Sequence, residues 1–476
     1  MNKSIPVLFF LLSCSASRQL ETPIVSQSPF LVTPYLQLGS NPTPDSMMVL
    51  WHVSEAMDSD TSWALKYKSA NDTVWTQSAM PVKTTLTIKG LEIFNVYRVK
   101  LANLDPGRNF NYTIAKNGFE VFSAEGKAIK SVSQPYRFVV SGDMGAGSKA
   151  AKQIATGIYK TNPDFVAIAG DIVYDSGLIS EYKTRFWPMY NSEKVNMHGL
   201  PLMQSIPFFA ALGNHDTYTH NLNLQPDALA YFHFWDHPLN GPEGNEGGPI
   251  VSELTANAKN RAAFLEGAGN RYPRMANYSF NYGNAHWTVL DANVYVDWTD
   301  DKLRDWLRKD LASAQDATWR FVLYHHPAIS SSHTHYEDQQ MRVVSTLFDS
   351  GKVDIVFNGH VHNYQRSFPM IVYSDPSKNK KGRVPNVSWT LDKEFNGKTD
   401  TSPNGVIYIV TGAGGQVLYD PEQQNDPSSW QKFTDKFISL IHSFSLLDIN
   451  GNNLKFSQVG SDGSNLDSFE INKAKN

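Results

Sequence analysis

The stretch "YRFVVSGDMGAGSKAAKQIATGIYKTNPDFVAIAGDIVYD", residues 136–175, contains two apolar runs on either side of a segment with helical composition. The first run enters a Gly-rich turn at residues 142–147, and the second begins after Pro163. Strand, helix and strand in this order are typical of a βαβ unit, in which two parallel strands share one sheet. The stretch therefore predicts an α/β fold.

Similar apolar runs that end in polar residues follow along the chain. They are "PFFAALGNHD" (207–216), "HWTVLDAN" (286–293), "WRFVLYHHP" (319–327), "KVDIVFNGH" (352–360) and "GVIYIVTGAGG" (405–415). Between two of these runs, "DKLRDWLRKDLASAQ" (301–315) has the pattern of an amphipathic helix. Ligand sites in α/β sheets gather at the carboxyl ends of strands, so the polar residues that end these runs are candidate site residues.

The segment before this region has a different pattern. Residues 29–130 contain short strand-like runs such as "SMMVLWHV" (46–53), separated by turns such as "LDPG" (104–107). This spacing predicts an all-β sandwich, and "VYRVKLANLDPGRNFNYTI" (96–114) resembles the last strands of a fibronectin type III domain. We expect residues 131–476 to form the α/β domain, with a polar surface loop at 373–404 and a C-terminal β-hairpin at about 440–476.

The composition narrows the class of protein. The 476 residues are enough for two or three domains, and 41% of them are hydrophobic, as in ordinary globular proteins. Lys and Arg total 42 against 46 Asp and Glu, which gives a net charge of −4. Proteins that bind nucleic acids usually carry a basic patch or an overall basic charge. We therefore expect no nucleic-acid partner.

Residues 1–28 predict a signal segment and a linker. Lys3 precedes the apolar run of residues 5–12, which is too short to cross a bilayer, because a spanning helix needs about 20 apolar residues. "LLSC" resembles a bacterial lipobox, which would make Cys14 a lipid-anchored residue and the one means of membrane attachment. The alternative is a plain signal cleaved near Ala16. Either way we expect an exported protein, which is secreted, periplasmic or anchored to the cell envelope.

Five strand ends carry residue types that bind metal ions: "SGDMG" (141–145), "AGDIVYDSG" (169–177), "LGNHD" (212–216), "VLYHHP" (322–327) and "NGHVH" (358–362). His360 and His362 are two residues apart, so in an extended segment both rings lie on one side. Strand ends of one sheet lie next to one another, so these distant segments can share a site. Carboxylate, phenol, amide and imidazole donors suit iron, zinc or manganese. Because Cys14 is the single cysteine, a thiolate zinc finger is excluded.

Together these motifs resemble those of the purple acid phosphatases, within the metallophosphoesterase superfamily. The chain gives GDMG (142–145), GDIVY (170–174), GNHD (213–216), VLYH (322–325) and GHVH (359–362). The resemblance covers about residues 30–470 and is closest to the large two-domain members. It implies a calcineurin-like metallophosphoesterase sandwich, in which mixed β-sheets are flanked by helices, preceded by the fibronectin type III-like domain.

The resemblance also implies a dinuclear metal site. A ferric ion would be held by Asp143, Asp171, Tyr174 and His362, and a second, divalent ion (zinc, iron or manganese) by Asp171, Asn214, His325 and His360. Asp171 would bridge the two ions. Many other metallophosphoesterases have a histidine two residues after the first aspartate, where this chain has Gly145, and Tyr174 takes its place as a ligand.

The implied activity is hydrolysis of phosphate monoesters by a metal-activated hydroxide. His215 lies where the family has a histidine that faces the substrate, and His335, in preference to His333, is the candidate for binding phosphate or protonating the leaving group. A phosphodiesterase or pyrophosphatase with the same metals is the alternative enzyme. A surface binding protein with a degenerate metal site is the alternative outside enzymes.

Other histidines and one aspartate near these motifs have simpler interpretations. We expect His326 to be a loop residue or to support a ligand, and Asp291 to act in a turn or in the same supporting way. We expect surface or packing roles for His220, His233 and His237, and a buried, hydrogen-bonded core position for His286.

Overall fold

The structure is a computed structural model that describes residues 28–58, 61–374 and 384–474. The expected signal segment and Cys14 lie outside the described residues. Within the described ranges, no helix has both the length and the apolar character needed to cross a membrane.

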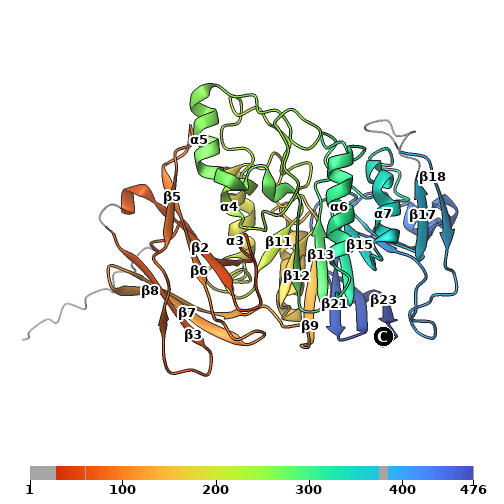
Figure 1. The fold of residues 1–476 in the computed structure, drawn as a ribbon, viewed down its shortest axis with the longest axis horizontal. Helices are drawn as coiled ribbons and strands as arrows, with labels where there is room; N and C mark the ends of the chain where they lie inside the picture. Colours follow the sequence, from red (N-terminus) through yellow and green to blue (C-terminus); the bar gives the residue numbers. More distant parts are fainter. Residues whose placement is uncertain (1–27, 59–60, 375–383, 475–476) are drawn as a thin grey trace, which may run out of the picture.

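Residues 32–127 form two four-stranded antiparallel sheets (Figure 1). Trp51 in the first sheet and Trp63 in the second lie with ring centroids 5.9 Å apart, and both are buried. The two sheets therefore pack face to face as the predicted all-β sandwich. The first sheet has the order β1 (Val32–Gln37), β2 (Met47–Ser54), β6 (Phe94–Leu101), β5 (Val82–Leu86), and the second β4 (Thr76–Gln77), β3 (Trp63–Ser69), β7 (Asn109–Lys116), β8 (Phe119–Lys127).

The βαβ unit predicted from residues 136–175 is confirmed. Strands β9 (Tyr136–Ser141) and β10 (Phe165–Ile168) pair in parallel, and helix α1 (Lys149–Thr161) connects them. The helix begins where the Ser148 hydroxyl accepts a hydrogen bond from the Ala151 N–H at 3.0 Å, and it ends at Asn162, which takes a left-handed φ of 51°.

These strands belong to a six-stranded sheet that also contains the end of the chain. Its order is β11 (Phe208–Ala210), β10, β9, β21 (Ser443–Asn450), β22 (Asn453–Gly460), β23 (Asn465–Asn472). Strand β21 pairs antiparallel with β9, so the terminal segment adds three strands to the sheet, one more than the expected hairpin.

A seven-stranded sheet faces the first across the core of the α/β region. Its order is β12 (Tyr278–Tyr282), β13 (Ala285–Val289), β14 (Trp319–Leu323), β15 (Ile355–Asn358), β19 (Ile407–Thr411), β16 (Tyr364–Ser367), β20 (Thr434–Ile438). Phe138 of β9 lies 5.3 Å from the Trp287 ring and 5.7 Å from the Phe321 ring. Helices α6 (Asp301–Ser313) and α7 (Ser345–Ser350) cover the outer side of this sheet in Figure 1.

The long connection between β10 and β12 carries strand β11 and most of the remaining helices. These are α2 (Ile179–Glu181), α3 (Trp187–Tyr190), α4 (Tyr231–Phe234) and α5 (Ala258–Ala268). The sandwich docks against this connection through backbone hydrogen bonds. The N–H of Leu36 donates to Met203 O at 2.8 Å, and the N–H of Lys127 donates to Ser205 O at 2.9 Å.

The expectation of a polar surface loop over the whole of 373–404 was wrong in part, because this range contributes to two paired strands. Strands β17 (Met370–Ser374) and β18 (Val387–Leu391) pair antiparallel, and residues 375–383 lie outside the described residues. The sequence "VSWTL" of β18 is rich in β-branched and aromatic residues, which favour strands.

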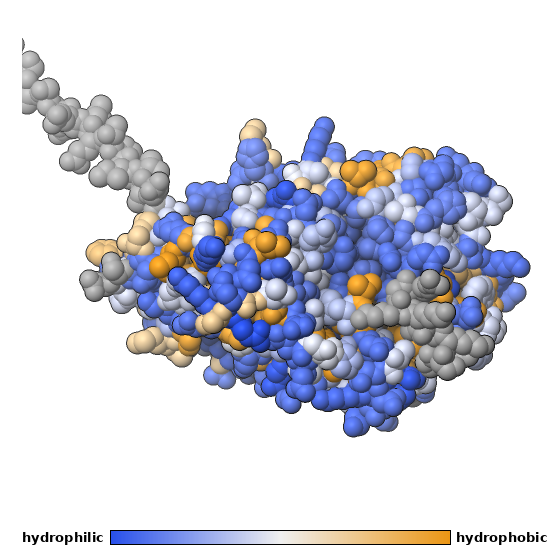
Figure 2. All heavy atoms as spheres, turned by 90° about the horizontal axis from the view of Figure 1, so that it is seen from above, coloured by the Kyte–Doolittle hydropathy of each residue, from blue (hydrophilic) through white to orange (hydrophobic). Residues whose placement is uncertain are grey.

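On the face viewed in Figure 2 the surface is mostly hydrophilic, with apolar side chains scattered over it.

Candidate metal centre

The predicted site residues of the first sheet lie directly after the carboxyl ends of its strands. Ser141 of β9 pairs with Ile168 of β10, and Asp143 and Asp171 follow these strand ends. Both aspartates take left-handed backbone conformations, with φ of 59° and 50°, which turn the chain away from the strand direction. The N–H of Asp143 donates to Gly170 O at 3.1 Å and holds the two turns together.

The second sheet brings three predicted ligands, His325, His360 and His362, to the same place. Leu323 of β14 pairs with Phe357 of β15, and the N–H of Gly359 donates to His325 O at 3.0 Å. A Cβ atom added at Gly359 would lie 2.7 Å from Asp143 Oδ2 and 3.0 Å from His325 Nδ1. Glycine is therefore needed at position 359, where the strand ends of the two sheets approach each other.

Three imidazole rings are each fixed through one nitrogen. Nδ1 of His325 lies 2.7 Å from Ala169 O, and Nδ1 of His362 lies 2.8 Å from Val417 O. Nε2 of His360 lies 3.2 Å from Asp338 Oδ2. In a neutral ring, the nitrogen that faces a carbonyl or carboxylate oxygen carries the proton. The opposite nitrogen of each ring is then left with a lone pair that faces the site.

These lone pairs face oxygen atoms. Asn214 Oδ1 lies 3.0 Å from Nε2 of His325 and 3.0 Å from Nδ1 of His360. Nε2 of His362 lies 3.3 Å from Asp143 Oδ1. Acceptors that converge in this way require protonated rings or a shared cation. Burial lowers the pKa of His360 to about 4 in spite of its hydrogen bond to Asp338, so a neutral His360 fits a cation.

Tyr174 is a buried phenol beside two carboxylates of the site. Its hydroxyl donates to Asp143 Oδ1 at 2.9 Å and lies 3.4 Å from Nε2 of His362. Burial, and then the negative charges of Asp143 and Asp171, raise the pKa of Tyr174 well above its usual value. The phenol therefore keeps its proton unless a cation replaces it.

Asp171 lies at the centre of the arrangement, where the family resemblance places the bridging ligand. Oxygens of Asp143 and Asp171 and a nitrogen of His325 all lie within 4.8 Å of one another. Burial raises the pKa of Asp171, but the rings of His325 and His215 outweigh this effect and hold it well below its usual value. Burial lowers the pKa of His325, whereas the carboxylate of Asp171 raises it, to about 9 overall.

The two predicted catalytic histidines lie on different sides of this centre. Nδ1 of His215 lies 2.7 Å from Asp175 O, and its Nε2 lies 3.9 Å from Asp171 Oδ2. The His335 ring lies 4.2 Å from the His360 ring. His333 and His335 are both exposed, and Nδ1 of His335 lies 3.0 Å from Asp338 Oδ2.

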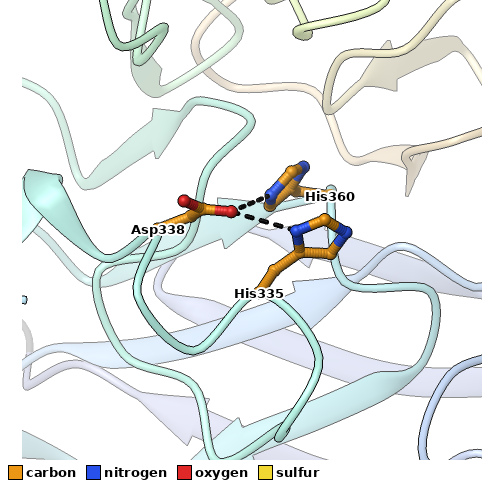
Figure 3. Close-up of side chains that lie close together, drawn as sticks. All are labelled: His335, Asp338 and His360. Atoms are coloured by element: carbon orange, nitrogen blue, oxygen red, sulfur yellow. Dashed lines mark hydrogen bonds and ion pairs between the residues drawn. The ribbon is translucent and has the colours of Figure 1, made fainter. Parts of the chain in front are cut away.

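Asp338 is a functional candidate that the sequence did not reveal. Its Oδ2 atom accepts hydrogen bonds from both Nδ1 of His335, at 3.0 Å, and Nε2 of His360, at 3.2 Å (Figure 3). The three side chains have the spacing of a metal site. However, Oδ2 of Asp338 already accepts a hydrogen bond from each of the two rings. This arrangement suits a residue that orients the two histidines. The spacing His-x-x-Asp in "HYED" was the only signal in the sequence.

The remaining candidates have supporting or packing positions. His326 is buried, with its ring 4.2 Å from that of His360. Asp291 is buried and accepts hydrogen bonds from the Tyr295 hydroxyl at 2.6 Å and the Asn293 side chain at 2.8 Å. Both positions agree with the supporting roles expected for them, and the other histidines named with them pack against neighbouring rings or polar side chains.

Comparison with known proteins assigns the class. Residues 136–364 match the family model for calcineurin-like phosphoesterases, and residues 405–468 match the model for the iron/zinc purple acid phosphatase-like protein C region. The fold and the converging donors therefore define a metallophosphoesterase.

Individual relatives narrow the class further. Purple acid phosphatase 23 of Arabidopsis thaliana is 26% identical over 360 residues, which cover 72% of this chain and 67% of the relative. Probable inactive purple acid phosphatase 1 of the same plant is 26% identical and is matched over 79% of this chain and 58% of its own length. The solved structure of a purple acid phosphatase from yellow lupin (Lupinus luteus) seeds has a TM-score of 0.62 at 18% identity, covering 92% of this chain and 74% of that one.

Within the metallophosphoesterases, the two family models and these relatives support a purple acid phosphatase. The matches to the first three curated relatives span between 46% and 67% of their lengths. The family implies iron with a second divalent metal, and the groups of converging side chains described above are candidates for holding them.

Proposed function

We propose that the protein is an acid phosphatase that hydrolyses phosphate monoesters. The observation that supports this most directly is the set of three imidazoles, each fixed through one nitrogen and each presenting the other to a carboxylate or amide oxygen. A hydrogen bond to the ring nitrogen that does not bind the metal orients a metal-binding histidine. The proposed ligands are Asp143, Asp171, Tyr174 and His362 for a ferric ion and Asp171, Asn214, His325 and His360 for a divalent one.

When bound, the two ions supply Lewis acidity and lower the pKa of water, so that hydroxide is available as a nucleophile. The chain supplies positioning and proton transfer. When its ring is protonated, His215 keeps its Nδ1–H on the Asp175 carbonyl oxygen and offers its Nε2–H to a phosphate oxygen. Protonated His335 keeps its Nδ1–H on Asp338, and its Nε2–H supplies the proton for the leaving oxygen.

The test uses the purified protein with measured metal content. We expect hydrolysis of 4-nitrophenyl phosphate at acid pH that exceeds hydrolysis of bis(4-nitrophenyl) phosphate. Faster hydrolysis of the diester would favour the phosphodiesterase alternative, and pyrophosphate as a third substrate tests the pyrophosphatase alternative. A protein with both metals bound and no hydrolysis of any of them would support the non-catalytic binding protein.

The domain organisation and location that we propose follow the sequence. Residues 29–130 would be a fibronectin type III-like domain, which is supported by the two packed four-stranded sheets, and residues 131–476 would be the catalytic domain.

We propose that the protein is exported and anchored by lipid at Cys14. Membrane fractionation of wild type and Cys14→Ser tests the anchor. If Cys14 is lipidated, the wild type should be found with the membranes and Cys14→Ser in the soluble fraction.

A further inference from the structure

The segment that carries His333 and His335 is held in an unusual way. We call residues 330–338 the histidine loop. It contains no strand or helix, and its first backbone N–H groups donate to side-chain oxygens. The pairs are Ser330 N to Gln339 Oε1 (2.9 Å), Ser331 N to Gln365 Oε1 (2.7 Å), Ser332 N to Ser330 Oγ (3.2 Å), His333 N to Gln423 Oε1 (2.9 Å) and Thr334 N to Asp420 Oδ2 (3.1 Å).

Asp420 is the charged member of this set of acceptors. Its Oδ2 atom accepts hydrogen bonds from the Ser332 hydroxyl and the Thr334 N–H, and its Oδ1 atom accepts one from the Thr334 hydroxyl at 2.7 Å. The residue is only 9% exposed. Hydrogen bonds to a buried carboxylate are stronger than those between neutral groups, so Asp420 is the strongest single restraint on the start of the histidine loop.

The residue before Asp420 contacts the other side of the site. The Tyr419 ring is stacked on the His362 ring, with centroids 4.0 Å apart and an interplanar angle of 15°. Its N–H donates to His362 O at 3.0 Å, and its ring lies 5.5 Å from that of His335. Two consecutive residues, Tyr419 and Asp420, therefore join a proposed metal ligand to the histidine loop.

We propose that Asp420 is a positioning residue that keeps His335 over the leaving-group side of the site. This inference rests on the proposed phosphatase function and on His335 as the proton donor. His335 has a left-handed φ of 60°, which an unrestrained histidine rarely adopts. Asp420 itself lies outside the predicted metal ligands and acts through Ser332 and Thr334.

The test exploits the leaving group. An alkyl phosphate has a poor leaving group that needs a proton as the P–O bond breaks, whereas 4-nitrophenolate leaves almost without one. General acid catalysis contributes about 10²–10⁴-fold to rate. In Asp420→Asn we expect kcat for an alkyl phosphate to fall by at least about tenfold, and kcat for 4-nitrophenyl phosphate by less than about threefold. Metal content should stay at the wild-type value.

Two further variants make the result specific. Thr334→Val keeps the buried carboxylate but removes one donor to it, and it should show the same pattern more weakly, even if Asp420→Asn fails to fold. Asp426→Asn removes a carboxylate of the same segment whose hydrogen bonds, among the described residues, come from the N–H and hydroxyl of Ser428 in its own turn, and it should leave both substrates unaffected.

The outcomes separate the two proposals. Equal losses on both substrates in Asp420→Asn and Thr334→Val, or no loss on either, would overturn the positioning role while leaving the phosphatase proposal intact. A wild-type protein that holds both metals and hydrolyses neither substrate would overturn the phosphatase function itself, and the positioning role with it.

Discussion

A single hydrogen bond of 3.2 Å joins Nε2 of His360 to Oδ2 of Asp338. The bond places the proton of the neutral ring on Nε2 and leaves Nδ1 free to face the proposed divalent ion. Asp338 therefore decides which nitrogen of His360 can bind a metal. Its second hydrogen bond, from His335, ties the proposed proton donor to the same oxygen atom.

Asp338→Asn should weaken binding of the divalent ion by about 10–100-fold, because hydrogen-bonded supporting residues contribute about that much to metal affinity. The measurement is competition with a chelator, followed by metal analysis. Glu337→Gln, which changes the exposed carboxylate next to it, is the matched control. Wild-type affinity in Asp338→Asn would show that His360 is oriented without it.

Asp171→Asn should lower the content of both metals together. One carboxylate is proposed to serve both ions, and an amide lacks its negative charge. Metal analysis of the purified variant, refolded or expressed with excess iron and zinc, should give well below one ion of each kind per chain. A variant that keeps both metals and full activity would contradict the bridging role.

Tyr174→Phe tests the ferric site by its spectrum. A phenolate bound to ferric iron gives a charge-transfer band in the visible, and the substitution removes the donor oxygen while keeping the ring. We expect a coloured oxidised wild type and a colourless variant, with iron measured in both samples. A band that survives the substitution, or an iron-replete oxidised wild type without one, would remove Tyr174 from the ligands.

His237 should limit stability at acid pH. Its ring is buried against Tyr278 at 5.0 Å, and burial lowers its pKa to about 3. A histidine whose folded pKa is depressed favours folding above its unfolded pKa of about 6.5, and this contribution is lost as the pH falls toward 3. Between pH 6.5 and 5 the loss is about 1.5 kcal/mol.

The variant His237→Phe keeps an aromatic ring at this position and cannot titrate. Thermal unfolding followed from pH 7 to 4.5 should show a shallower fall in Tm for this variant than for wild type. His198→Asn, at an exposed position, should follow the wild-type curve. Parallel curves for wild type and His237→Phe would mean that His237 does not contribute to the acid sensitivity.

The strand–helix–strand unit could be predicted because its signals are local. The apolar runs of β9 and β10 and the helix between them follow one another within residues 136–168. The convergence of the strand-end motifs could be predicted by the same logic, since parallel strands carry their carboxyl ends to one side of the sheet, whereas the individual ligands were predicted from the family resemblance. Strand β18 was missed because polar and Pro residues surround its short apolar pattern.

Asp338 and Asp420 could not be predicted for a different reason. Each accepts a hydrogen bond from a segment that is far away in the sequence or lies in an irregular loop, as Asp420 does from the Thr334 hydroxyl. Carboxylates in loops are common and usually solvated, so residue type alone gives no signal. Only the three-dimensional arrangement of the loops distinguishes these two from their neighbours.

The position of β21 has a consequence for how the protein is made. This strand, residues 443–450, lies between β9 and β22 and pairs with β9, residues 136–141. During synthesis, β9 therefore has one bare edge until about three hundred further residues have left the ribosome. The turn that carries Asp143 follows this strand, so we expect it to reach its final position only after β21 has paired with β9. A chaperone that shields bare strand edges should therefore raise the yield of folded protein, and chains truncated before residue 443 should aggregate.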